Sequence, residues 1–338
     1  MVSMKEIARR CNVSVATVSK SLNGYSDISE ETRNLIQKTA SELGYLPNSS
    51  ARALKTNRSH NIGVLFVDES RSGLTHDYFN HVLESFKKTA EEKGYDITFS
   101  SGNISGQKMS YYEHCRYRGV DGVVVACVNF YTDEIQELLR SELPIVTIDH
   151  VCDGKIAVVS NNVQGMEELV TYAFRKGHKK IAYIHGDDTA VTKNRLSSFY
   201  RTLKRFGIEV PDEYVLQAPY RNADEAAERT AQLLDLKDPP TCIFCPDDFA
   251  AIGCINEIRE RGLRIPEDIS IAGYDGINIA QILEPKLTTI CQDTAAIGRT
   301  AAEKLVELIE HPKTTLIERY TINGILFKGA SIKDMNKV

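Results

Sequence analysis

The sequence predicts a small all-α domain followed by an α/β core of two lobes, each built on a doubly wound parallel sheet. Three short helical patterns fill residues 1–47. From residue 61 apolar strand patterns alternate with helical ones, and the alternation restarts after Ser160, which indicates two similar lobes. A chain of 338 residues is long enough for two or three domains. We therefore expect a helical domain over 1–47, a linker over 48–60 and a core over 61–330.

Composition places the chain among ordinary globular proteins, since 42% of its residues are hydrophobic and 26% are charged. The longest apolar stretch, 123–128, is far shorter than the roughly 20 residues that span a bilayer. The first residues, MVSMKEIARRC, contain no apolar signal-peptide core. We expect a cytoplasmic protein with no membrane partner.

Charge is unevenly distributed along the chain. Residues 1–58 contain nine Lys or Arg and five acidic residues, a net charge of +4, while the whole chain carries −5, so the remainder carries −9. A basic head on an acidic body is the asymmetry expected when only the head meets the phosphates of a nucleic acid. The head is therefore the candidate DNA-binding part.

Eight cysteines are scattered through the sequence, and two of them, Cys242 and Cys245, form a CxxC motif. The motif lies in an apolar strand pattern, and no second CxxC or HxxxH completes a zinc site. We interpret the cysteines as free thiols of a reducing compartment and predict neither a metal site nor a cofactor. Redox sensing remains an open alternative.

The first two helices of the head have recognisable start signals. Ser3 and Glu6 have the spacing of a capping box, and the helix that they start should end near Cys11. Ser14 is the predicted N-cap of a second helix over 15–22, which closes at an Asn-Gly pair. The turn between these helices is short, as in a helix-turn-helix motif.

A third helix is predicted between Ser29 and Gly44, and its apolar residues at helical spacing are Leu35, Ile36, Ala40 and Leu43. In a helix-turn-helix the second helix enters the major groove. Lys20 could reach guanine acceptors there, whereas Val15 and Ala16 offer apolar contact, for instance to a thymine methyl. The candidates for phosphate hydrogen bonds are Ser14, Thr17, Ser19 and Asn23. A three-helix bundle without a ligand is the alternative.

The linker contains a short helical pattern, NSSARALKT, over 48–56. A helix of about two turns is marginal in water, so we expect it to need support, which the basic residues Arg52 and Lys55 suggest is DNA. Leu54 is a candidate wedge between base steps of the minor groove. The candidate DNA contacts of the segment are Asn48, Ala51, Arg52 and Leu54. A plain exposed linker remains the alternative.

The core shows strand patterns at 62–67, 96–100, 122–126 and 144–148 in the first lobe and at 180–186, 241–245 and 269–275 in the second. Helices are expected at 78–93, 192–206, 249–261 and about 295–310, and a final strand pair within 315–327. Doubly wound sheets bind ligands beyond the carboxyl ends of their strands. The cleft between the two lobes is therefore the expected pocket.

Polar side chains follow several of these strands. Carboxylates accept hydrogen bonds from sugar hydroxyls, a guanidinium donates them, and an aromatic ring covers the C–H side of a sugar. The candidate effector-binding residues of this kind are Asp77, Tyr78, Asp149, Arg195, Tyr220, Asp247, Phe249 and Asp275. One of the neighbours Asp247 and Asp248 should only cap the following helix, and we assign that role to Asp248.

Several of these motifs resemble the LacI/GalR family of bacterial transcription regulators. The runs VATVSKSLNG, GYLPN and SARALK are similar to its head and hinge, and RKGHKKIAYIHG, PDDFAAIGCINEIRERGLRIPEDISIAGYDG and LTTICQD are similar to its core. The likeness covers almost the whole chain. It implies a helix-turn-helix head, a hinge helix that folds on the operator, and a periplasmic-binding-protein-like core.

The resemblance also implies roles for single residues. The positions of Arg195, Asp247 and Asp275 contact the effector in the family, an aromatic residue at the position of Tyr220 packs on it, and a leucine at the position of Leu54 enters the minor groove. This chain has Lys20 where many relatives have arginine, and Asp247 where asparagine is usual. In the family the chain crosses between the lobes three times, so the lobes should comprise about 61–160 with 291–320, and about 161–290 with 321–330.

These observations predict a non-enzymatic repressor that binds a palindromic operator as a homodimer and is controlled by a small sugar-like effector. We expect the effector to release the DNA, although a corepressor would use the same residues. The tail, SIKDMNKV, has no heptad for a coiled coil, which favours a dimer over a tetramer. A solute-binding protein for transport or chemotaxis and a carbohydrate-processing enzyme using the core carboxylates are the alternatives.

Overall fold

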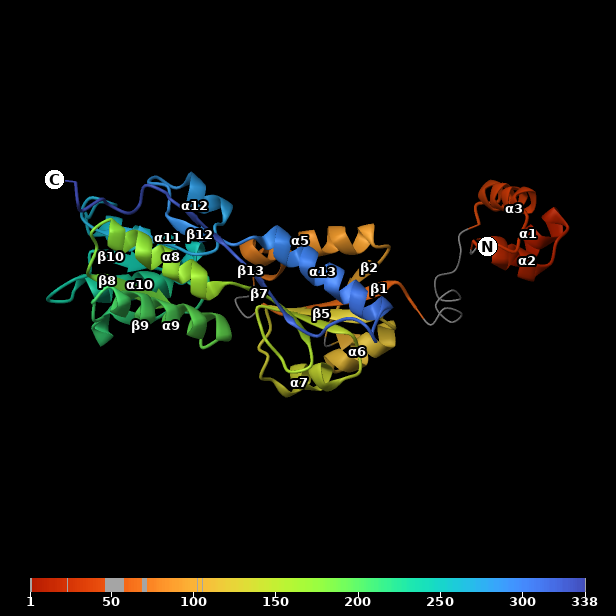
Figure 1. Ribbon diagram of the computed structural model, residues 1–338, viewed down its shortest axis with the longest axis horizontal. Coiled ribbons are helices and arrows are strands. Elements are labelled where there is room, and N and C mark those ends of the chain that lie inside the picture. Colours follow the sequence, from red (N-terminus) through yellow and green to blue (C-terminus); the bar gives the residue numbers. More distant parts are fainter. Residues whose placement is uncertain are drawn as a thin grey trace. The chain divides into compact units, whose positions relative to one another are not determined.

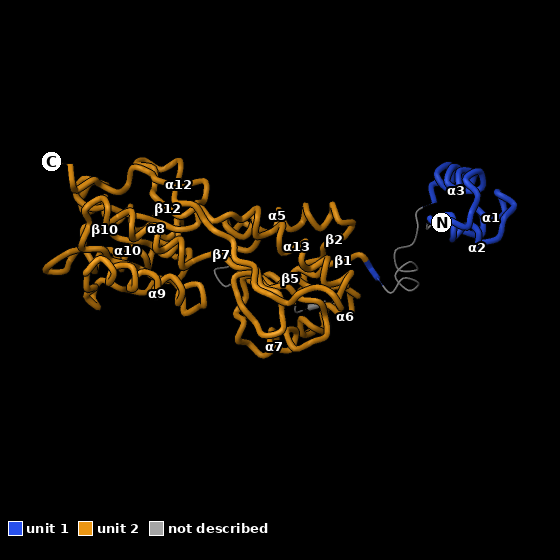
Figure 2. The backbone as a smooth tube through the Cα atoms, viewed as in Figure 1, with its two compact units in different colours: residues 1–59 blue, residues 60–338 orange. Residues whose placement is uncertain are grey.

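The computed structural model describes residues 2–22, 24–45, 58–68, 72–101, 103–104 and 106–337. Two compact units make up the chain, residues 1–59 and residues 60–338 (Figure 2). Five predicted DNA contacts lie outside the described residues: Asn23, Asn48, Ala51, Arg52 and Leu54. No helix within the described ranges is long and apolar enough to cross a membrane.

The head consists of helices α1 (Met4–Cys11), α2 (Val15–Leu22) and α3 (Glu30–Glu42). They enclose a small core formed by Ile7, Ala8, Cys11, Val18, Ile36 and Ala40. The Ser14 hydroxyl accepts a hydrogen bond from the Thr17 amide at 3.0 Å, and the Ser29 hydroxyl accepts one from the Thr32 amide at 3.3 Å. The predicted N-cap of α2 and the predicted start of α3 at Ser29 are thus confirmed.

Two details of the head were predicted wrongly. The Ser3 side chain makes no capping hydrogen bond, and the Glu6 carboxylate instead binds Arg9, at 2.8 Å, and Arg10. Basic residues three and four positions later compete for a carboxylate that a capping box would turn back to the N-cap. Leu35 is 49% exposed, because α3 packs through the narrow stripe that contains Ile36 and Ala40.

The first lobe is a six-stranded parallel sheet in the order β13-β7-β6-β5-β1-β2 (Figure 1). Its strands are β1 (Asn61–Phe66), β2 (Asp96–Phe99), β5 (Gly122–Ala126), β6 (Ile145–Ile148), β7 (Ile156–Ser160) and β13 (Arg319–Ile322). Its helices are α5 (Asp77–Glu92), α6 (Tyr111–Arg118), α7 (Asp133–Arg140) and α13 (Thr294–Glu310). A short hairpin, β3 (Asn103–Ile104) and β4 (Gln107–Lys108), and the 3-10 turn η1 (Gly73–Thr75) complete the lobe.

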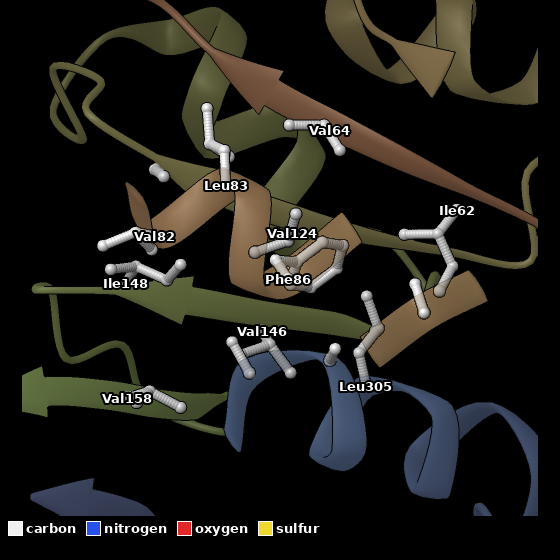
Figure 3. Close-up of a cluster of buried hydrophobic side chains, with 14 of the residues drawn as sticks. Ile62, Val64, Val82, Leu83, Phe86, Val124, Val146, Ile148, Val158 and Leu305 are labelled. Atoms are coloured by element: carbon white, nitrogen blue, oxygen red, sulfur yellow. The ribbon is translucent and has the colours of Figure 1, made fainter. Parts of the chain in front are cut away.

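Both faces of this sheet are covered, as predicted. Val124 of β5 packs in one cluster with residues of α5 and α13, such as Phe86 and Leu305 (Figure 3). Its neighbours Val123 and Val125 pack in another cluster with residues of α6 and α7. Because successive side chains of a strand point to opposite faces, the run GVVVA supplies both cores and is buried throughout.

The second lobe has a four-stranded parallel sheet in the order β11-β10-β8-β9. Its strands are β8 (Ile181–His185), β9 (Val215–Gln217), β10 (Cys242–Phe244) and β11 (Ser270–Ala272). Its helices are α8 (Asn162–Arg175), α9 (Ala190–Arg205), α10 (Ala223–Leu234), α11 (Asp248–Glu260), α12 (Asn278–Ile282) and the 3-10 turn η2 (Asp212–Tyr214). Residues of α8 and α9 pack on one face and residues of α10 and α11 on the other, so this sheet is also doubly wound.

Both strands predicted within 315–327 form, but they do not pair with each other. Strand β13 joins β7 in the first lobe, while β14 (Ile325–Phe327) pairs antiparallel with β12 (Thr289–Cys291). The two strands are joined by Asn323-Gly324, a dipeptide that favours hairpins, but each strand finds its partner in a different sheet. The chain therefore crosses between the lobes close to residues 161, 292 and 323.

Candidate functional site

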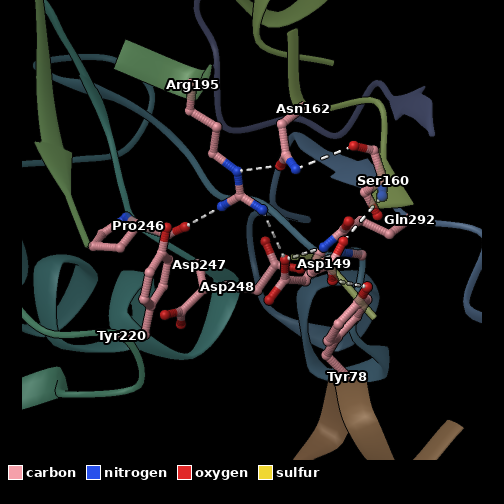
Figure 4. Close-up of polar contacts among 12 residues, drawn as sticks. Tyr78, Asp149, Ser160, Asn162, Arg195, Tyr220, Pro246, Asp247, Asp248 and Gln292 are labelled. Carbon is pink, nitrogen blue, oxygen red and sulfur yellow. Dashed lines mark hydrogen bonds and ion pairs between the residues drawn. The ribbon is translucent and has the colours of Figure 1, made fainter. Parts of the chain in front are cut away.

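Arg195 of α9 is buried in the region where the lobes meet, with only 3% of its surface exposed. Its Nε donates to Asn162 Oδ1 at 2.7 Å, and one terminal nitrogen donates to the Pro246 carbonyl at 3.0 Å. The other terminal nitrogen lies 3.6 Å from Asp275 Oδ1. The guanidinium also lies over the Tyr274 ring, 3.5 Å from its centre. Contacts on several sides fix its orientation before any ligand arrives (Figure 4).

The first lobe contributes a hydrogen-bonded pair to the same region. The Tyr78 hydroxyl donates to Asp149 Oδ2 at 2.8 Å, and the Ser160 amide donates to Asp149 Oδ1 at 2.9 Å (Figure 4). Asp149 follows β6 in the left-handed conformation, with φ of 56°, which aspartate tolerates better than most residues. Burial raises the pKa of Asp149, and the hydrogen bonds from Ser160 and Tyr78 oppose that shift.

Asp275 follows β11 with φ of 103°, a conformation that residues other than glycine rarely adopt. Its Oδ1 accepts a hydrogen bond from Gln292 Nε2 at 2.7 Å. Burial is the main reason why the pKa of Asp275 is raised to about 6, and the nearby carboxylates Asp247 and Asp149 add to the shift while Arg195 opposes it. We call the region around Tyr78, Asp149, Arg195, Asp247 and Asp275 the interlobe site.

The predicted division of roles between Asp247 and Asp248 was wrong. Asp247 is the N-cap of α11, because its Oδ1 accepts from the Ala250 amide at 2.7 Å, and its Oδ2 accepts from the Arg221 amide at 2.8 Å. Asp248 is the first residue of the helix and accepts from the amides of Gly276 and Ile277. The helix begins one residue earlier than expected, so the cap moves to Asp247. Asp248 instead ties α11 to the loop that carries Asp275.

Arg221 joins the two lobes and was missed by the sequence analysis. Its Nε donates to Ser72 Oγ at 3.1 Å, and one terminal nitrogen donates to Asp77 Oδ2 at 2.8 Å. The guanidinium lies 4.5 Å from the centre of the Phe249 ring. Arg221 therefore gathers two predicted site residues, Asp77 from the first lobe and Phe249 from the second. Its position directly after Tyr220, another predicted site residue, was the signal that could have identified it.

The Tyr220 ring closes the interlobe site on the side of the second lobe (Figure 4). Its hydroxyl and that of Thr192 share a hydrogen bond of 2.7 Å. The ring packs so closely on Gly186 that a Cβ at that position would lie 2.2 Å from ring carbons. A side chain at position 186 would therefore force the ring out of this position.

The structure brings all eight predicted effector residues into one region.

The candidate recognition helix α2 presents a small exposed face. Ser14, Val15, Ala16 and Lys20 are exposed, while Thr17 and Ser19 are half-buried. The Ser14 and Thr17 hydroxyls share a hydrogen bond of 2.8 Å, and Lys20 forms an ion pair with Asp27. DNA would therefore have to replace Asp27 as the partner of Lys20.

Comparisons with known proteins agree with this architecture. Residues 3–48 match the model for bacterial regulatory proteins of the lacI family, and residues 170–332 match a periplasmic binding protein-like domain. The HTH-type transcriptional repressor PurR of Vibrio atlanticus is 30% identical over 96% of this chain and 100% of its own length. The chain belongs to the LacI/GalR family. It is a helix-turn-helix transcription regulator with a periplasmic-binding-protein-like core.

Solved structures of LacI-family proteins share the fold. The lac repressor dimer bound to operator and the anti-inducer ONPF has a TM-score of 0.81 and 25% identity, covering 98% of this chain and 99% of its own. A LacI family regulator from Enterococcus faecium with bound ribose has a TM-score of 0.68 and 26% identity, covering 81% of this chain and 99% of its own. The LacI/GalR fold class predicted from the sequence is thereby confirmed.

Proposed function

We propose that this LacI/GalR protein represses transcription from a two-fold symmetric operator. We propose that it acts as a homodimer in the cytoplasm. We also propose that a small polyhydroxylated ligand, a sugar or sugar derivative, binds at the interlobe site and changes operator affinity. The observation that carries the proposal is the buried Arg195 guanidinium, which lies 3.6 Å from Asp275 Oδ1 and close enough to Asp149 and Asp247 to oppose the rise that burial causes in their pKa values. The relatives are repressors, which indirectly supports a protein without catalytic activity.

The chemistry of the interlobe site suits a ligand with many hydroxyl groups. A hydroxyl both donates to a carboxylate oxygen and accepts from a guanidinium, so one sugar could satisfy Arg195 and the carboxylates together. The Tyr220 ring offers an apolar surface for the C–H face of the ring. The E. faecium regulator that carries ribose shows that a protein of this fold accommodates such a ligand.

A surface hollow elsewhere on the first lobe is a weaker candidate for the effector. It has a volume of about 530 Å³ and is lined by Tyr112, Asp133, Glu137, Arg140 and Ser141. No charged residue of its lining is buried, as a site for a polar ligand would require. Among the described residues, none of its lining comes from the second lobe. A ligand there would have no means of changing the relation between the lobes, so we assign the effector to the interlobe site.

Effector binding is expected to depend on pH through Asp275. Its ionised form accepts from ligand hydroxyls and pairs with Arg195, and its pKa is about 6. Affinity should rise with pH up to about 6 and then level off, falling below that point by up to about tenfold per pH unit, the limit for one proton. Isothermal titration calorimetry between about pH 5 and 8, a range that brackets the pKa of Asp275, measures this dependence.

Stability should show the opposite dependence on pH. The pKa of Asp275 is raised above its ordinary value of 3.8, so the folded state binds more protons between about 4 and 6. The contribution of this group to the free energy of unfolding therefore falls as pH rises through that window.

Asp275→Asn should weaken ligand binding and remove the pH dependence of the ligand affinity. A pH dependence that persists in this variant would assign it to another carboxylate.

The ion pair between Arg221 and Asp77 is expected to favour the arrangement in which the lobes are held together. A ligand that contacts both lobes binds that arrangement, so loss of the ion pair should lower the affinity for the ligand. Asp77 is 44% exposed, which limits the effect of Asp77→Asn to about threefold. Asp96→Asn, an exposed position at the start of β2, is the matched control. Tighter binding by Asp77→Asn in calorimetry would show that the pair opposes the ligand.

Selection of DNA sequences from a random pool tests the first half of the proposal. The full chain should select a two-fold symmetric site, and sedimentation should show two chains on each site. Selection of no sequence, or one chain on an asymmetric site, would contradict the proposed homodimeric repressor.

A further inference from the structure

Three side chains of the kinds that bind transition metals converge at one edge of the first sheet. Asp68 lies two residues after β1, Cys127 directly follows β5, and His76 precedes α5. Their ligand atoms all lie within 4.8 Å of one another. Strands β1 and β5 are parallel neighbours with Phe66 opposite Ala126, so the first two residues leave the sheet at the same edge. The residues are far apart in sequence and match no metal-binding spacing, so the sequence predicted no metal site.

The fold orients each of the three side chains. Asp68 Oδ2 accepts hydrogen bonds from the Ser72 amide at 2.7 Å and the Gly73 amide at 3.0 Å. His76 is the N-cap of α5, and its Nδ1 accepts from the Phe79 amide at 3.5 Å. Cys127 has a left-handed backbone, with φ of 53°, that turns the chain sharply at the strand end. The hydrogen bonds to Asp68 fix the direction of its carboxylate. The long bond to His76 Nδ1 would be lost when the ring binds a metal, because that nitrogen would then carry either the ion or the ring proton.

The set of one thiol, one imidazole and one carboxylate suits Zn²⁺. Zinc binds sulfur, nitrogen and oxygen ligands at about 2.0–2.3 Å in tetrahedral geometry, and sites with three protein ligands leave a fourth position open. Ligand atoms around one such ion lie about 3.3–3.8 Å apart, so small side-chain rotations would bring these three into range. Calcium and magnesium prefer oxygen ligands alone and do not fit a site with a thiol.

We propose that Asp68, His76 and Cys127 bind one divalent ion of the Zn²⁺ type, with a fourth position open to water or another ligand. Its three ligands are not among the predicted effector residues, although they leave the same edge of the sheet as Asp149 and His76 directly precedes Asp77. The site adjoins Ser72 and Asp77, the partners of Arg221, because the Ser72 amide donates to Asp68 and Asp77 directly follows His76. A bound ion would hold this part of the first lobe in place and so support the Arg221 contact.

Titration of the full chain with Co²⁺, under reducing and oxygen-free conditions, tests the proposal. Cobalt replaces zinc in tetrahedral sites, and a thiolate ligand gives a near-ultraviolet charge-transfer band besides the visible bands. One Co²⁺ per chain should bind with this band, and added Zn²⁺ should abolish it. Cys127→Ser should lose the band, whereas Cys152→Ser, a matched control at a half-buried cysteine of the same lobe, should keep it.

Two conservative variants distinguish ligation from structural effects. Asp68→Asn can still accept the Ser72 and Gly73 hydrogen bonds, and His76→Asn can still cap α5, but both should weaken Co²⁺ binding at least about tenfold. A wild-type chain without the charge-transfer band, or a band that survives in Cys127→Ser, would overturn the proposal. The wild-type titration decides the matter even if a variant fails to fold.

Discussion

Replacing Arg195 by lysine is expected to weaken effector binding at least about 100-fold, while the operator affinity measured without effector stays within about threefold of the wild-type value. Lysine retains the positive charge beside Asp275, so the charge of the site is unchanged. It lacks the planar fork that reaches Asn162, the Pro246 carbonyl and Asp275 at once, and it cannot stack on Tyr274 in the same way. The contacts that position the guanidinium in the interlobe site are therefore lost together.

Calorimetry with the effector and fluorescence anisotropy with operator DNA measure the two affinities. Arg201→Lys is the matched control, since Arg201 lies on the same helix with its side chain 62% exposed. Arg195→Lys should also lower the free energy of unfolding by about 1–3 kcal/mol, because buried acceptors lose their donors. Effector affinity that is unchanged in Arg195→Lys would exclude Arg195 from the site.

Lys20→Ala is expected to weaken binding to the preferred operator about 10- to 100-fold and to relax the base preference at one position of each half-site. Lys20 is exposed on α2, and in the absence of DNA its partner is Asp27. If Lys20 binds a guanine, its loss removes contacts that only one base pair provides. Binding to unrelated DNA depends on phosphate contacts and should fall much less.

Anisotropy with the operator, its single-base variants and unrelated DNA, at one salt concentration, gives the comparison. Lys38→Ala, at an exposed position of α3, controls for the loss of one positive charge. Equal losses on operator and unrelated DNA would show that Lys20 contacts phosphate rather than a base.

Elements with a strong local pattern were predictable from the sequence. Helix α2 has the predicted bounds because Ser14 caps it, and β5 has the predicted bounds because GVVVA is apolar throughout and follows Asp121. Strand β7 was not identified, since it lies a few residues after β6 with no helical pattern between them. The pairing of β13 and β14 with different sheets could not be read from two adjacent strand patterns, because it depends on partners far away in the sequence.

The composition of the interlobe site was also partly predictable. Asp149, Asp247 and Asp275 were identified because they follow strands, and the carboxyl ends of parallel strands meet at one edge. The contact between Arg221 and Asp77 joins two lobes, and no local pattern indicates which side chains meet there. The exchange of roles between Asp247 and Asp248 depends on a shift of one residue in the start of α11, which helix signals do not resolve.

The most direct test of the account measures operator binding of the full chain by fluorescence anisotropy, at fixed salt, with and without a panel of sugars and sugar derivatives. We expect one ligand to change operator affinity, and the operator to change the affinity for that ligand by the same factor, because linkage between two sites is reciprocal. The same ligand should leave the operator affinity of Arg195→Lys unchanged at concentrations that act on the wild type. A ligand that alters operator binding equally in the wild type and in Arg195→Lys would contradict control through the interlobe site.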